Sequence, residues 1–355
     1  MKPNILHITP DFNYACGRSY YVYLLLKYFR RMGYNAILAT NGGDSFERLK
    51  DLQIPYYVAN SIQIKTPVSY SKSIKALTKI ILEHDIDIVH THHRYSEFLA
   101  LHLAKSTGKS KIKTVLTSLS IVNRKYNIEY RSDKIIAVSR VIEKMLTERF
   151  KVGKDKIELI PNFVDTDELN EFPTTEKPVT GSFNILSIGR FHKEKNFGLL
   201  LKALKIMNDR SYKAVLIGEG PELNDYRKYI SKNHLNALII GPQKQLNTFY
   251  KKADICVLPS ARDPFPNFML QSGLFSKPFI GSNVDGIAEL IKDGDNGFLF
   301  ENGDAKGLAE KLIKIKNNIA LAEKCASELH TDVMSNYTQN SCIPQIENLY
   351  NRLIS

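Results

Sequence analysis

Two positively charged side chains, Arg190 and Lys195, follow an apolar run that ends at Gly189. Arginine presents a planar fork of donors and lysine a compact charge, and the two together suit a pyrophosphate. If a bond to that pyrophosphate breaks, negative charge grows on the departing phosphate, and fixed cations stabilise the transition state more than the ground state. A solvated turn that happens to carry two charges is the alternative interpretation.

A second candidate site follows the apolar run that ends at Pro259, where a proline-rich loop leads into a helix expected to begin near Asn267. The free amides at the start of a helix bind anions without any side-chain charge. Asp263 lies in the loop and Gln271 about one turn inside the helix, so the two could hold separate parts of one extended ligand. Asp263 capping the local backbone is the alternative, because aspartate often does so in loops.

Three histidines, His90, His92 and His93, end another apolar run. Alternation along a strand places His90 and His92 on one face and His93 on the other, so only two of them could share an ion. We therefore predict no metal site here. A role in lining a cleft is the interpretation that we favour for this cluster.

The elements that must position these residues are short apolar strands alternating with amphipathic helical segments, in two series. Such alternation is typical of a parallel sheet with helices on both faces, and 355 residues exceed what one core accommodates. We predict an α/β fold of two doubly wound domains with parallel sheets that face a central cleft, where ligands bind beyond the carboxyl ends of the strands. The expected strands are residues 5–9, 35–40, 86–90, 113–117, 134–139 and 157–161, then 184–189, 214–218, 237–241, 255–259, 278–282 and 297–301.

The domain limits follow from composition. Prolines, threonines and glycine interrupt the strand pattern and mark a linker at 171–182. The first domain is then 1–170 and the second 183–335, and residues 336–355 form a C-terminal helix that crosses back to the first domain.

The net charge of +12 is concentrated in the first half of the chain. Lys72, Lys75 and Lys79 fall at helical spacing on one face, and such a surface indicates an anionic partner, or else a solvated face. No known nucleic-acid-binding module accompanies the charge, so we predict no nucleic-acid partner. The four cysteines lack metal or disulfide spacing and no apolar run is long enough to span a membrane, which together predict a cytoplasmic protein.

The whole chain resembles the retaining glycosyltransferases of family four, which have the GT-B fold with two Rossmann-like domains. Each motif is weak alone, but all occur in the family's order. They are DKIIAVS at 133–139, IPNFVD at 160–165, Gly189-Arg190 with Glu194-Lys195, GEGP at 218–221, ADI at 253–255, GIAELI at 286–291 and DGDNGFL at 293–299.

The resemblance implies a role for each candidate residue. Arg190 and Lys195 would hold the diphosphate of a nucleotide-sugar donor, Asp263 would face the transferred sugar, and Gln271 would bind the ribose. Gly17 matches a glycine in the first strand–helix turn, where a missing side chain lets backbone approach a ligand. The remaining donor-binding positions act through backbone groups, at the diphosphate or at the base; they are Phe265, Pro266, Asn267 and Phe268, and Gly241, Pro242 and Gln243.

The sequence departs from the family at three of these places. Asp263 and Gln271 stand where the family has paired acids. Cys16-Gly17 stands where the family has two consecutive glycines, so that Cys16 replaces the first of them. A histidine that commonly follows the fourth strand in the family is missing here, where the sequence reads Thr117-Ser118-Leu119-Ser120. His92 or His93 is the candidate to contact the acceptor or sugar instead.

The resemblance therefore implies a metal-independent hexosyltransferase without a cofactor. It would move a sugar with retention from a nucleotide-sugar, expected to be a UDP-sugar, to a glycan or lipid-diphosphate acceptor in surface polysaccharide biosynthesis. We expect it in the cytoplasm, with peripheral contact to the anionic inner face of the plasma membrane. The alternative is a catalytically inactive GT-B protein that binds a glycan or a partner, which the changes at Gln271 and Leu119 motivate.

Overall fold

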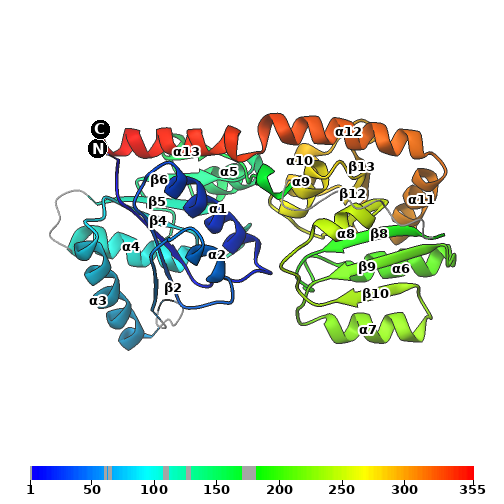
Figure 1. Cartoon of the computed structure of the whole chain (residues 1–355), viewed down its shortest axis with the longest axis horizontal. Helices are drawn as coiled ribbons and strands as arrows, with labels where there is room; N and C mark the ends of the chain where they lie inside the picture. The colour runs from blue at the N-terminus through cyan, green and yellow to red at the C-terminus, as the bar shows by residue number, and fades with distance from the viewer. Residues whose placement is uncertain (1, 60–61, 63–65, 107–111, 125–128, 170–180) are drawn as a thin grey trace. The chain divides into compact units, whose positions relative to one another are not determined.

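The computed structural model describes residues 2–59, 62, 66–106, 112–124, 129–169 and 181–355. They form two compact units, each built on one parallel sheet (Figure 1). The first unit comprises Met1–Asn162 and Gln339–Ser355, and the second Phe163–Thr338. The predicted fold class, two doubly wound Rossmann-like domains with parallel sheets, is confirmed.

The sheet of the first unit has the order β3-β2-β1-β4-β5-β6-β7, with every described pair parallel. Its inner strands are buried along their whole length, which is why they appear in the sequence as continuous apolar runs rather than alternating ones. The strand order reverses between β1 and β4, the place where such sheets bind ligands. The strands are β1 (Ile5–Thr9), β2 (Ala36–Thr40), β3 (Tyr56–Val58), β4 (Ile88–Thr91), β5 (Lys113–Ser118), β6 (Lys134–Ala137) and β7 (Ile157–Leu159).

The sheet of the second unit has the order β10-β9-β8-β11-β12-β13 and is also parallel. Here the order reverses between β8 and β11, so the loops that leave these two strands meet at one edge. The strands are β8 (Phe183–Ile188), β9 (Tyr212–Ile217), β10 (Ala237–Ile240), β11 (Ile255–Leu258), β12 (Phe279–Ser282) and β13 (Phe298–Phe300).

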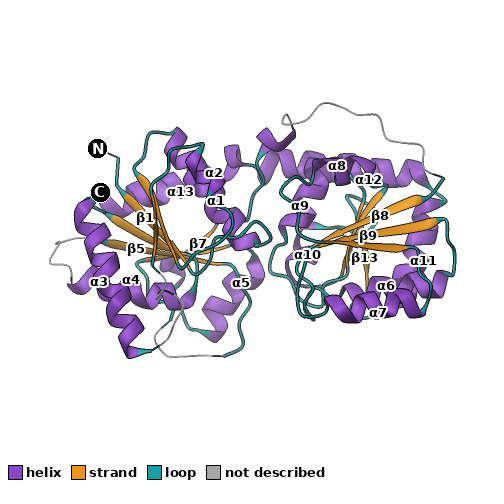
Figure 2. Cartoon of the chain, turned by 60° about the horizontal axis from the view of Figure 1, so that its bottom comes forward, coloured by secondary structure: helices purple, strands orange, loops and turns teal. Residues whose placement is uncertain are grey.

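Helices cover both faces of each sheet (Figure 2). In the second unit α6 and α7 lie on one face and α8 and α12 on the other. The first unit contains α1 (Gly17–Arg31), α2 (Glu47–Lys50), α3 (Pro67–Glu83), α4 (Arg94–Ser106), α5 (Arg140–Lys144), continued by a π-helical turn at Met145–Arg149, and α13 (Gln339–Ile354). The second contains α6 (Phe197–Met207), α7 (Leu223–Lys232), α8 (Asn247–Lys252), α9 (Asn267–Leu274), α10 (Asp285–Leu290), α11 (Ala305–Lys316) and α12 (Ile319–Asn336).

The unit boundaries differ from the expected ones at 170 and 335. The chain joins the second unit at Phe163, because the N–H of Val164 donates to the carbonyl of Tyr337 at 2.9 Å and Val164 pairs with Thr338. It returns to the first unit at Gln339. Most of the expected linker lies outside the described residues.

The last helix, α13, completes the core of the first unit. The Tyr350 ring packs against Phe29 of α1 at 5.0 Å between centroids, and the Tyr34 hydroxyl donates to Glu347 Oε1 at 2.6 Å. Tyr350 is fully buried. The first unit is therefore assembled from two segments that are far apart in the sequence.

Candidate active site

The turn after β8 carries the two predicted cations. Phe191 is buried and anchors the turn: its N–H donates to the carbonyl of Glu219 at 2.7 Å. A β-carbon at Gly218 would lie 2.0 Å from the carbonyl oxygen of Gly189, so only glycine allows the turns after β8 and β9 to pack this closely. The backbone around Arg190 and Lys195 is thereby fixed.

The loop after β11 joins this turn through an ion pair. Lys195 Nζ bonds to Asp263 Oδ2, 68 residues later in the chain. The Asp263 side chain is 5% exposed and also accepts from Ser260 Oγ at 3.2 Å. The backbone adds a second link, from the N–H of Ala261 to the carbonyl of Glu194 at 2.7 Å. Two stretches that the sequence singled out separately therefore form one site.

Arg190 is the accessible cation of this site. Its side chain is exposed, whereas Lys195 is partly buried against Asp263. Within the described residues the Arg190 guanidinium has no ion pair or hydrogen bond. It is therefore available to a ligand without breaking an existing contact.

Helix α9 begins directly after this loop, at Asn267, with Pro266 in the capping position. This helix is fully described: the side chain of Pro266 makes no capping hydrogen bond, and the first turn contains no acidic residue. Phe265 and Phe268, next to the helix start, are buried, and the centroid of the Phe265 ring lies 5.4 Å from that of Tyr337. A helix start without a negative charge in its first turn is suited to an anion.

Gln271 lies one turn further along α9 and is nearly buried, at 9% exposure. Its Oε1 accepts a hydrogen bond of 3.0 Å from the hydroxyl of Tyr250. The carbonyl is thus engaged by the protein, which leaves the amide N–H groups as the part of Gln271 with spare hydrogen-bonding capacity.

The residues expected near a base, Gly241, Pro242 and Gln243, follow β10 and are exposed. Gln243 Nε2 donates to the carbonyls of Gly241 and Pro242 at 3.2 and 3.1 Å, which folds the side chain back on the loop. Because β10 is parallel to β8 and β11, this loop lies at the same carboxyl edge of the sheet.

Gly17, His92 and His93 belong to the first unit, at the carboxyl ends of β1 and β4. Gly17 is the first residue of α1, and Cys16 precedes it in an extended conformation without capping the helix. We expected His92 or His93 to line a cleft. His92 instead lies in the core at 2% exposure, and His93 is the more accessible of the two.

A further histidine, His7, lies beside His90 and His92 and was not predicted from the sequence. Register places His7 of β1 directly beside His90 of β4. Of the three histidines that end the strand, His90 and His92 come together and His93 stays apart, as alternation predicts, and His7 supplies the third imidazole of the group. His7 Nδ1 and His92 Nε2 share a hydrogen bond of 3.1 Å. Burial lowers the pKa of His7 to about 3 and holds those of His90 and His92 well below their usual value, with the neighbouring imidazoles adding to the effect.

The three imidazoles offer ligand atoms within 4.8 Å of one another, a spacing that a metal ion could exploit. However, His90 is bonded through both ring nitrogens, to the Tyr350 hydroxyl at 2.6 Å and Thr117 Oγ1 at 2.7 Å. An ion bound to His90 would have to displace one of these two bonds. The arrangement therefore favours a hydrogen-bonded core over a metal centre.

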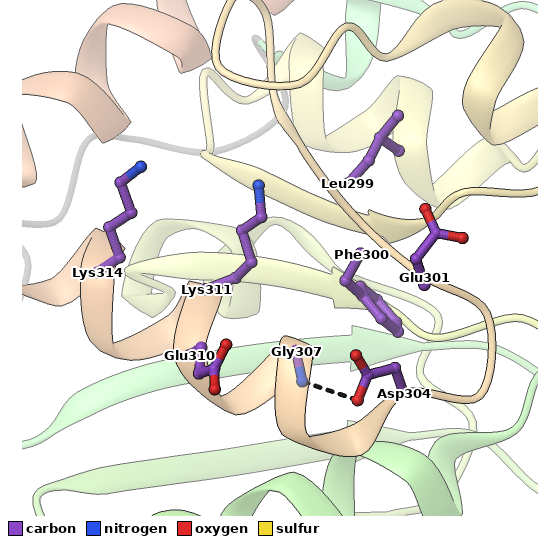
Figure 3. Close-up of a pocket in the computed structure, with 8 residues that line it drawn as sticks. All are labelled: Leu299, Phe300, Glu301, Asp304, Gly307, Glu310, Lys311 and Lys314. Carbon is purple, nitrogen blue, oxygen red and sulfur yellow. Dashed lines mark hydrogen bonds between the residues drawn. The ribbon is translucent and has the colours of Figure 1, made fainter.

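A separate pocket of about 350 Å³ lies between β13 and α11 in the second unit (Figure 3). Several of its charged groups are already engaged: Asp304 accepts from the N–H of Gly307 at 2.9 Å, and Lys311 pairs with Asp293 at 2.6 Å. None of the predicted site residues lines it. We assign this pocket no role in the candidate active site.

Comparison with known proteins identifies the class to which this fold and site belong. The model "Glycosyltransferase Family 4" matches residues 17–168, and "Glycosyl transferases group 1" matches residues 170–329. The two matches span both units, and the chain belongs to the group 1 glycosyltransferases of the GT-B fold. It is a glycosyltransferase of polysaccharide or glycoconjugate biosynthesis.

Particular relatives match most of this chain. The chain is 27% identical over 294 residues, 77% of either chain, to the N-acetyl-alpha-D-glucosaminyl L-malate synthase of Bacillus anthracis. It is 24% identical over 317 residues, 80% of either chain, to the UDP-Gal:alpha-D-GlcNAc-diphosphoundecaprenol alpha-1,3-galactosyltransferase of Escherichia coli. The structure of Anabaena HepE in complex with UDP-glucose superposes with a TM-score of 0.86 at 16% identity, over 99% of this chain and 100% of HepE.

Proposed function

We propose that the protein transfers a hexose, with retention of anomeric configuration, from a UDP-sugar to a glycan or lipid-linked acceptor of surface polysaccharide biosynthesis. The ion pair between Lys195 and Asp263 is the observation that carries the proposal. It joins the cationic turn to the loop that leads into α9, as a site for a diphosphate-sugar requires. The complex of HepE with UDP-glucose supports UDP as the nucleotide.

In this site the donor diphosphate lies between Arg190, Lys195 and the start of α9. When the bond to the sugar breaks, negative charge moves onto the departing UDP, and these fixed positive groups stabilise it without a metal ion. Asp263 faces the sugar, Gln271 the ribose, and residues 241–243 the base. Lys195 is held by Asp263, so its position is set before the donor arrives.

The first unit is the proposed acceptor side, with His93 near its ligand edge. Gly17 keeps the donor-binding role that the resemblance implies. A stripe of exposed lysines, Lys72, Lys75 and Lys79, runs along α3 with exposed apolar Val68 and Leu82 towards its two ends. We propose that this stripe contacts an anionic membrane at its cytoplasmic face, where a lipid-diphosphate acceptor would be found. No helix in the described ranges is long and apolar enough to cross a membrane.

The test measures donor binding and turnover separately. Melting temperatures with UDP, UDP-glucose, UDP-galactose and UDP-N-acetylglucosamine identify the donor, because ligand binding to the folded state raises apparent stability. UDP release from that donor then reports turnover. Lys195→Gln should abolish most release, while Lys193→Gln, which removes an exposed charge from the same turn, should leave it unchanged.

The outcomes also separate the proposal from an inactive binding protein. Stabilisation by a UDP-sugar together with UDP release supports a transferase. Stabilisation without release, even with glycan or lipid-linked acceptors added, identifies a binding protein. Anomeric configuration of the product, read by proton NMR, decides whether transfer occurs with retention.

A further inference from the structure

Asp285, the first residue of α10, lies in the left-handed region with φ +41°. L-residues other than glycine rarely adopt this conformation, although aspartate and asparagine do so more often than most. Strain of this kind persists where the surrounding structure demands it. At Asp285 this conformation coincides with a hydrogen bond to Asp263, 22 residues earlier in the chain.

The backbone of Asp263 is held from both sides by Asp285 and its neighbour. Asp285 Oδ2 accepts the N–H of Asp263 at 3.0 Å, and the N–H of Gly286 donates to the carbonyl of Asp263, also at 3.0 Å. A β-carbon at residue 286 would lie 1.8 Å from the carbonyl oxygen of Pro264. The two segments are therefore in direct backbone contact.

This contact bears on the start of α9 because the intervening segment is stiff. Pro264 and Pro266 each have a fixed φ, so the orientation of Asp263 is passed on to Pro266, the residue that precedes α9. The side chain of Asp263 is bound separately, by Lys195. Asp285 thus fixes the backbone of Asp263, while Lys195 fixes the Asp263 carboxylate.

We propose that Asp285 is a positioning residue of the donor site: it fixes the loop 263–266 so that the Asp263 carboxylate and the start of α9 address the same diphosphate-sugar. The inference rests on the function proposed above. This role also explains why two carboxylates, those of Asp263 and Asp285, lie close together although they repel each other. Asp285 is half-buried and its pKa is raised, chiefly by burial and also by the charge of Asp263. Glycine at this position would avoid both the strain and the repulsion, but would lose the bond to Asp263.

The test uses Asp285→Gly, in which a structural and a positioning role predict different results. Glycine relieves the backbone strain, so the melting temperature should stay within about 4 °C of that of the unchanged protein. UDP release from UDP-glucose should nevertheless fall about tenfold in kcat/KM, the equivalent of about one hydrogen bond. The affinity for UDP, measured by calorimetry, should fall with it.

Three further variants make the result specific. Asp285→Asn keeps an oxygen that can accept from Asp263 and should restore release to within about threefold of the unchanged rate. Asn208→Gly relieves the same left-handed conformation at an exposed position, φ +47°, and should change neither release nor UDP affinity. Lys195→Gln, measured alongside, tests the donor site itself.

Full release and UDP affinity in Asp285→Gly, with Lys195→Gln inactive, would overturn the role of Asp285 and leave the proposed function standing. Full activity in Lys195→Gln would overturn the donor site and the inference with it. A loss in Asp285→Asn as large as in Asp285→Gly would also refute the backbone role, because the accepting oxygen is retained.

Discussion

The hydroxyl of Tyr250 donates to Oε1 of Gln271 at 3.0 Å, and both residues are buried. The Tyr250 ring stacks on Phe275 at 4.7 Å between centroids, so the hydroxyl is held in place. Gln271 therefore presents N–H donors to a ligand. In the proposed site the ribose hydroxyls, which a carboxylate binds best, would meet a weaker partner in Gln271.

Gln271→Glu should tighten UDP binding. A carboxylate has a second oxygen for the ribose while the first still accepts from Tyr250, which gains roughly 1 kcal/mol or about fivefold in Kd. Calorimetric titration with UDP provides the measurement. Gln245→Glu adds the same charge at an exposed position of the same unit and controls for a general electrostatic effect. Unchanged or weaker affinity in Gln271→Glu would count against the ribose placement.

Arg190→Ala should lower kcat/KM for UDP release about a hundredfold. The developing charge on UDP loses a cation, which costs about 3 kcal/mol of transition-state stabilisation. The side chain is exposed and without an ion pair among the described residues, so the melting temperature should not change. Lys193→Ala is the matched control, since it removes an exposed cation three residues away. Equal rates in the two variants would refute the assignment of Arg190.

The histidine core predicts a loss of stability in acid. His7, His90 and His92 are held neutral when folded but titrate near pH 6.5 when unfolded, so below that pH the unfolded chain binds more protons. Each group then lowers the free energy of unfolding by about 1.4 kcal/mol per pH unit, and for His7 the decrease continues to about pH 3. Their contribution is fully present above pH 6.5.

Urea unfolding at pH 7, 6, 5 and 4 measures this slope. His7→Gln should flatten it by about 1.4 kcal/mol per pH unit, since one neutral imidazole is removed. His234→Gln, at an exposed position of the second unit, should leave the slope as it was. A slope that is identical in His7→Gln and the unchanged protein would show that His7 is not held neutral.

The lysine stripe of α3 predicts binding to anionic vesicles. Replacing Lys72, Lys75 and Lys79 by glutamine should weaken binding to phosphatidylglycerol vesicles, measured by co-sedimentation at low salt. The expected loss of binding free energy is about 1 kcal/mol per charge, or about 3 kcal/mol in total. The triple variant at exposed Lys202, Lys205 and Lys228 of the second unit should bind as before. Equal losses in the two triple variants would indicate net charge rather than a docking face.

Most of the fold could be predicted because buried parallel strands appear as uninterrupted apolar runs. The exception is β3, which has three residues at a sheet edge, all at least partly exposed, and so gives little signal. The change from α-helix to a π-helical turn at Met145 was not predicted from the sequence.

The site was predictable where it depends on topology. Lys195 and Asp263 follow strands that flank the reversal of strand order, and that rule alone brings them together. His7 and Asp285 were not predictable in this way. His7 depends on the register between β1 and β4, and Asp285 on a left-handed backbone and a contact across 22 residues.

The return of α13 to the first unit affects the order in which the chain can fold during synthesis. The second unit is one continuous segment and has all its parts once Thr338 has been made. Synthesis of the first unit starts earlier, but its core is complete only when the 16 residues of α13, with the buried Tyr350, have been made. A nascent chain that stops short of α13 therefore holds a finished second unit beside an open core in the first.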